Sequence, residues 1–69
     1  MKNLKNEIIT IRQQYECKHV GEHELQQFRD RLHQVNNQAK ITVERGVSNV
    51  VYFYVELESE KYGNIMITE

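Results

Sequence analysis

Four residues of the types that bind metal ions or attack substrates lie in the first half of the chain: Cys17, His19, His23 and His33. The run C-x-H-x₃-H is not a zinc spacing, because a tetrahedral zinc site needs four ligands that converge from a rigid turn. Catalysis by Cys17 would need a neighbouring base and an oxyanion site, for which a hairpin of short helices offers no pocket. We therefore predict a free thiol and exposed imidazoles, with no bound metal ion.

The carboxylates and glycines give no better basis for catalysis. Glu56 and Glu58 would share one face of a strand, but an exposed position leaves carboxyl groups in water, where they serve as solubilising neighbours of an apolar strand. The three glycines, each at a predicted turn, form no phosphate-binding loop: Gly21, Gly46 and Gly63. We predict a protein that is not an enzyme and holds no cofactor.

Basic and amide residues on the second half of the helical region raise the alternative of nucleic-acid binding. A recognition helix presents such side chains to a groove, and the sequence supplies Arg29, Arg31, Lys40, Gln26, Gln27 and Asn37. Glu22, Glu24 and Asp30 dilute the positive charge, and a tight hairpin lacks the crossed helices of a helix-turn-helix. We therefore expect the exposed side of this helix to be solvated, and a small nucleic-acid-binding regulator that uses the second helix is the alternative.

Length and charge set the broad class. The chain has 69 residues and a net charge of −1, which suits a single domain over residues 1–69 and lacks the charge excess of a typical nucleic-acid binder. Its single cysteine fits a reducing compartment. Residues 1–7 lack the apolar core of a signal peptide, and no apolar run is long enough to cross a bilayer. We expect a soluble cytoplasmic protein with no membrane partner.

Two amphipathic helices are predicted before residue 40. Helical spacing relates Leu4, Ile8, Ile11 and Tyr15, which predicts a helix that begins near Asn3 and ends between residues 19 and 21, where Gly21 would close it. A second apolar stripe consists of Leu25, Phe28, Leu32, Val35 and Ala39. The short connection predicts an antiparallel helical hairpin.

From residue 41 the apolar period changes to two, which predicts strands. Ile41 and Val43 begin the first strand, residues 45–49 supply a turn, and residues 50–57 form the most strongly apolar strand of the chain. A polar turn over residues 58–61 precedes a last strand over residues 64–68. The predicted fold is α+β, in ααβββ order: the hairpin packs on one face of a three-stranded antiparallel β-meander.

Alternation divides the sheet into two faces. The face toward the helices would carry Val51, Phe53, Val55 and Leu57 of the central strand, with Ile41, Val43, Ile65 and Ile67 from its neighbours. No element is left to cover the opposite face. We predict that it binds protein, either a second copy or a foreign target, through Val50, Tyr52, Tyr54, Tyr62 and Met66. The alternative is a solvated tyrosine face.

The order of elements, a helical hairpin followed by three antiparallel strands, resembles the core of the ribosome-dependent RNase toxins of toxin–antitoxin modules. Those toxins begin with a strand that this chain lacks, and their sheets carry basic catalytic residues where Tyr52, Tyr54 and Glu56 stand here. The resemblance implies a toxin-like nuclease as a further alternative, and it transfers no site residue.

The first expectation is a small non-enzymatic protein-binding module. Small size, many Asn, Gln, Lys and Glu residues, and the absence of Pro and Trp suit a bacterial or phage accessory protein. Such a protein would act as an inhibitor by occluding a protein target, and it could be a homodimer.

Overall fold

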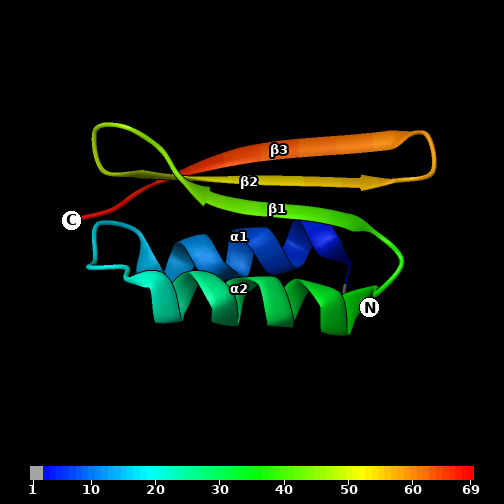
Figure 1. Ribbon diagram of the computed structural model, residues 1–69, viewed down its shortest axis with the longest axis horizontal. Helices are drawn as coiled ribbons and strands as arrows, with labels where there is room; N and C mark the ends of the chain where they lie inside the picture. Colours follow the sequence, from blue (N-terminus) through cyan, green and yellow to red (C-terminus); the bar gives the residue numbers. More distant parts are fainter. Residues whose placement is uncertain (1–2) are drawn as a thin grey trace.

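A computed structural model describes residues 3–69 as two helices followed by a three-stranded antiparallel sheet. The sheet order is β1-β2-β3, so the most apolar strand is central, and both helices pack on one face of the sheet (Figure 1). The predicted α+β arrangement and its ααβββ order are confirmed. The elements are α1 (Leu4–Tyr15), α2 (Glu22–Val35), β1 (Lys40–Arg45), β2 (Val50–Leu57) and β3 (Glu60–Ile67).

Helix α1 begins where its cap predicts and ends earlier than predicted. The Asn3 side chain accepts a hydrogen bond from the Asn6 N–H at 2.8 Å, which satisfies one of the free donors of the first turn. The helix ends at Tyr15 because Glu16 leaves the helical conformation with a ψ of 133°; Cys17 then adopts a left-handed φ of 64° and donates its N–H to the Ile67 carbonyl at 2.8 Å. Gly21, predicted to close α1, is instead the extended N-cap of α2.

Helix α2 joins the other elements through its apolar stripe. Leu25, Phe28 and Leu32 are buried as predicted. The Phe28 ring lies 4.9 Å from the Tyr15 ring of α1 and 5.9 Å from the Phe53 ring of β2, measured between centroids. One aromatic side chain therefore contacts both the other helix and the central strand.

The β2–β3 connection is tighter than predicted. Leu57 pairs with Glu60, so the loop is only Glu58-Ser59, and β3 begins at Glu60 rather than at residue 64. Residues directly opposite one another in an antiparallel pair share a face. The two-residue loop therefore decides which side chains of β3 face the helices.

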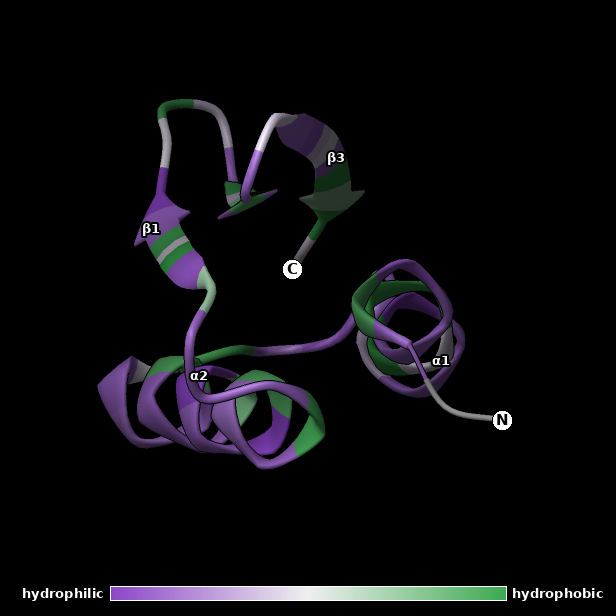
Figure 2. Cartoon of the chain, turned by 90° about the vertical axis from the view of Figure 1, so that its right-hand side faces the viewer, coloured by the Kyte–Doolittle hydropathy of each residue, from purple (hydrophilic) through white to green (hydrophobic). Residues whose placement is uncertain are grey.

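The predicted orientation of β3 is wrong for this reason. The register sets Met66 opposite the buried Val51 and Tyr62 opposite Val55, so both point toward the helices, and Met66 is fully buried. Ile65 and Ile67, predicted to be inside, are 48% and 55% exposed on the other face. Figure 2, which looks along the sheet, shows both helices on the same side of the strands.

Candidate functional site: the open face of the sheet

The face of the sheet that points away from the helices, called here the open face, is built as rows across the three strands. The pairings place Lys40, Glu56 and Lys61 in one row, followed along the strands by a second row and a third. The second row is Thr42, Tyr54 and Gly63; the third is Glu44, Tyr52 and Ile65. Val50 and Ile67 pair beyond them. The open face is thus an apolar strip with charged side chains at its margins.

Each exposed tyrosine ring packs on a glycine: Tyr52 on Gly46 of the β1–β2 loop, and Tyr54 on Gly63 of β3. A Cβ atom added to Gly46 would lie only 2.1 Å from Cε2 of Tyr52, so the Tyr52 ring rests directly on the Gly46 backbone. A Cβ atom on Gly63 would lie 3.7 Å from Cδ2 of Tyr54, an ordinary contact distance. The rings keep 43% and 38% exposure respectively, so each presents apolar area to solvent while its other side packs on backbone.

Gly63 leaves a hollow in the open face. The hollow has a volume of about 520 Å³ and is lined by Tyr52, Phe53, Tyr54, Gly63, Asn64 and Ile65. Because Phe53 is buried on the opposite face, its backbone supplies the floor. Ile65, two residues along the same strand from Gly63, forms one wall of the hollow and is an exposed apolar side chain. Ile65, called here the knob, and the hollow at Gly63, called here the hole, are thus adjacent on β3.

Polar groups at the outer edges of the sheet are partly occupied. Arg29 of α2 donates to the Val43 carbonyl of β1 at 2.6 Å, and the Cys17 N–H occupies the Ile67 carbonyl of β3. The Ile65 N–H donates to Oδ1 of its neighbour Asn64 at 2.8 Å. These contacts occupy one carbonyl of the β1 edge and two backbone groups of the β3 edge, and to that extent they oppose the addition of a further strand.

The predicted binding residues divide between the two faces. Val50, Tyr52 and Tyr54 lie on the open face, Val50 half-buried. Tyr62 lies on the helix side, where Nζ of Lys5 stands 5.4 Å from its ring centroid and Nδ2 of Asn64 donates to its hydroxyl at 2.8 Å. Met66 belongs to the core.

Sequence reasoning missed Ile65 and Ile67 as members of the open face. Either alternation of residues 62–67 offers apolar side chains, so only the length of the Glu58-Ser59 loop distinguishes the two faces. The exposed Val47, 81% accessible in the β1–β2 loop, was also missed.

The arginines considered for nucleic-acid binding make contacts inside the molecule. Nε of Arg31 lies 2.9 Å from Oε2 of Glu7, a buried carboxylate of α1, and Nη1 of Arg31 donates to Gln14 at 2.8 Å. Arg29 is engaged with β1 as described above. Both guanidinium groups therefore connect elements of the fold.

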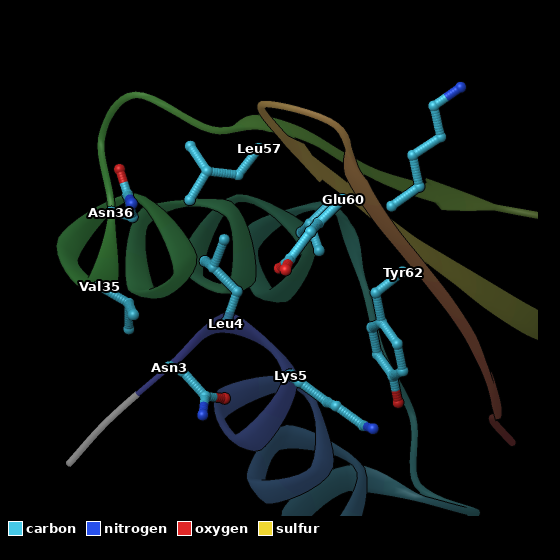
Figure 3. Close-up of a pocket in the computed structure, with 10 residues that line it drawn as sticks. Asn3, Leu4, Lys5, Val35, Asn36, Leu57, Glu60 and Tyr62 are labelled. Atoms are coloured by element: carbon cyan, nitrogen blue, oxygen red, sulfur yellow. The ribbon is translucent and has the colours of Figure 1, made fainter.

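A second concavity lies at one end of the molecule, between the start of α1, the end of α2 and the β2–β3 hairpin (Figure 3). It measures about 580 Å³ and combines apolar walls, including Leu4, Val35 and Leu57, with Lys5, Glu60 and Lys61. The described residues that line it include a single carboxylate, the exposed Glu60, and neither His nor Cys. Among the residues that line it, this cleft therefore offers no pair of carboxylates for acid–base catalysis.

Cys17 is a free, exposed thiol. Over residues 3–69, no three side chains of His, Cys, Asp or Glu gather in an arrangement that could hold a metal ion. In the same part of the chain, no helix has both the length and the apolar character needed to cross a membrane.

The geometry of the open face is the main guide to function. Comparison of the chain with known protein families, curated proteins and solved structures found no match.

Proposed function

We propose that the protein is a non-enzymatic protein-binding module and that the open face is its interaction surface. The observation that carries this proposal is the group of exposed apolar side chains formed by Tyr52, Tyr54, Ile65 and Ile67 on adjacent strands. Contiguous apolar patches with polar margins are typical of protein interaction sites, and tyrosine is enriched in them. A role as a cytoplasmic accessory or inhibitor protein is consistent with such a surface.

The shape of the surface favours a folded partner. A peptide that adds a strand needs free backbone groups at a sheet edge, whereas the contacts of Arg29, Asn64 and Cys17 occupy part of both edges. A shallow strip with a hollow suits a partner that presents an apolar surface of its own. Nucleic-acid binding by α2 has less support, because Arg29 and Arg31 already bind groups within the fold.

Site-specific cross-linking tests the proposal. A photoreactive amino acid is placed at Tyr54 on the open face and, as a matched control, at Gln27 on the exposed side of α2. Irradiation in cells that express the chain should give a defined protein adduct from position 54 and none from position 27. The adduct should disappear when Ile65→Lys is added, because a charge in the apolar strip opposes its burial.

Adducts of equal yield from both positions would contradict the proposal, as would the absence of any adduct from position 54. Circular dichroism of each variant verifies that the fold is retained. An adduct with a second copy of the chain and an adduct with another protein both support a binding role, and mass spectrometry of the product separates them.

A further inference from the structure

We infer that the open face fits a second copy of this chain, packed face to face with its strands antiparallel to those of the first copy. This inference rests on the proposed function, since it names the partner of the same surface. It is based on two independent features of the open face: the arrangement of its charges and the adjacent knob and hole of β3.

A two-fold axis that lies between the sheets can be oriented in two simple ways. An axis along the strands would place each row over the same row of the partner. The row of Lys40, Glu56 and Lys61 would then stack on itself, with Glu56 over Glu56 and Lys40 over Lys61. Like charges directly opposite each other are unfavourable, so this arrangement is rejected.

An axis across the strands, between the row of Tyr54 and the row of Tyr52, reverses the order of rows. The row of Thr42, Tyr54 and Gly63 then covers the partner's row of Glu44, Tyr52 and Ile65. Lys40 lies one row, or about 7 Å along the strand, from Glu44 of the other copy and about 10 Å from it across the space between the sheets, and the two side chains extend toward each other. Within one chain the two residues are four positions apart, about 13 Å on a strand, and their side chains extend in parallel. In the dimer Lys40, which lies opposite Glu56 of its own chain, therefore gains a second carboxylate neighbour. The row of Lys40, Glu56 and Lys61 lies at the end of the interface, over the partner's pair of Val50 and Ile67.

The same axis brings the knob of one copy to the hole of the other. Gly63 lies over Ile65 of the second chain, and by symmetry Ile65 lies over the second chain's Gly63. The exposed isoleucine would enter the hollow of about 520 Å³ between Tyr52 and Tyr54. A glycine in a strand interior often marks a place of close approach by another group. The dimer gives Gly63 such a role.

The size of the open face predicts modest affinity. Strand spacing and rise give a footprint of roughly 27 by 14 Å, which is small beside the area of about 800 Å² per partner in a standard interface. We therefore expect a weak dimer, so that sedimentation equilibrium should span about 10 µM to about 1 mM.

The decisive variant is Gly63→Val, which fills the hollow. A Cβ atom at Gly63 meets only Phe53 O and Cδ2 of Tyr54, both at 3.7 Å, so the monomer should accept the side chain. We expect self-association to weaken by tenfold or more, although the change makes the face more apolar. A face that associated through nonspecific apolar adhesion would bind equally well or better, and that result would overturn the inference.

Thiol cross-linking tests the direction of packing. Sheets packed face to face lie about 10 Å apart, which exceeds the reach of a disulfide, so a short bis-maleimide is used as the bridge. In a Cys17→Ser background, chains with Thr42→Cys should cross-link to chains with Glu44→Cys, because these positions face each other in the antiparallel arrangement. Chains with Lys40→Cys and chains with Lys61→Cys would face each other only if the strands were parallel, so they should cross-link far less. Equal yields from the two mixtures, or no dimer in the first, would overturn the antiparallel arrangement. Lys40→Glu should weaken self-association, and adding Glu44→Lys to the same chain should restore it.

Self-association and the binding of another protein are tested by separate measurements. If the wild-type chain is monomeric up to about 1 mM, the self-association is wrong. A specific adduct from position 54 with a different protein would in that case still support the binding module.

Discussion

Glu24 stabilises the start of α2 from within the helix. The N-cap is Gly21, which has no side chain with which to cap the first turn, and instead its N–H donates to Oε1 of Glu24 at 2.8 Å. This bond is the main cause of a pKa of Glu24 below its ordinary value; the N–H of Glu24 itself contributes next, and the positive charges of His23 and His19 contribute less. The carboxylate thus satisfies a free helix donor and favours the positive end of the helix dipole.

The lowered pKa predicts how the stability of the protein responds to acid. A carboxyl group whose pKa is lower in the folded state stabilises the fold above its unfolded pKa, and this contribution is lost as the pH falls through the folded value. Glu24→Gln should therefore be less stable than the wild type at neutral pH. The difference in stability should shrink as the pH falls through the pKa that Glu24 has in the folded protein. Thermal unfolding over a pH series measures it.

The matched control is Glu22→Gln in the same helical turn, where the carboxylate is exposed. Its stability should approach that of the wild type at neutral pH. A Glu24→Gln variant whose deficit stayed constant down to strongly acidic pH would contradict the assigned role of the carboxylate.

At the scale of elements, the β2–β3 loop has the greatest influence on the fold. It contains only two residues, and Glu58 adopts a left-handed φ of 58°, which costs a residue with a side chain about 1–2 kcal/mol relative to glycine. Glu58→Gly should raise the free energy of unfolding by about 0.5–1 kcal/mol, because relief of this strain outweighs the added freedom of the unfolded chain.

Urea unfolding measures that gain, with Ser59→Gly as the control in the same loop. The control residue has no positive φ, so glycine there should be neutral or destabilising. A destabilised Glu58→Gly variant would show that the loop does not hold the conformation described.

The strand pairing also explains how far the sequence predicts this fold. Helical and alternating periods are strong local signals, and they locate α1, α2, β1 and β2 because each buries a clear apolar stripe. They do not distinguish Met66 from Ile65, since β3 offers apolar side chains on both faces. Likewise, Gly21 is the residue type expected to end α1, but Glu16 ends it earlier, next to the contact of Cys17 with Ile67. These details depend on contacts between distant segments.

The orientation of β3 can be tested by two substitutions of neighbouring residues. Met66→Lys places a charge in the core, and we expect it to destabilise the protein by more than about 3 kcal/mol or to prevent folding. Ile65→Lys places the same charge on the open face and should change stability by less than about 1 kcal/mol. Urea unfolding of both variants provides the comparison. The opposite ranking would support the orientation expected from the sequence.

At the scale of the whole molecule, two layers depend on one small core. The buried side chains of both helices and all three strands form a single cluster, with Phe28 between Tyr15 and Phe53. A domain of this length has a total stability of about 3–10 kcal/mol, and half of the sheet surface contributes nothing to its core. The apolar side chains of the open face therefore remain exposed to solvent in the monomer.

Phe28→Ala tests this dependence directly. Removal of a buried phenylalanine costs about 3–5 kcal/mol, which is comparable with the whole stability of so small a domain, so we expect a chain that is largely unfolded at 25 °C. Circular dichroism and urea unfolding report the loss. Phe28→Leu should retain much of the stability, because it keeps most of the buried volume.

Tyr52→Ala is the counterpart on the open face. It removes an aromatic ring that is 43% exposed, so the monomer should lose clearly less stability than Phe28→Ala, while self-association through the face weakens. Because a dimer stabilises the folded state by mass action, the unfolding midpoint of the wild type should also rise with protein concentration, and that of Tyr52→Ala should rise less. A midpoint that is independent of concentration in both chains would show that the fold stands without the second copy.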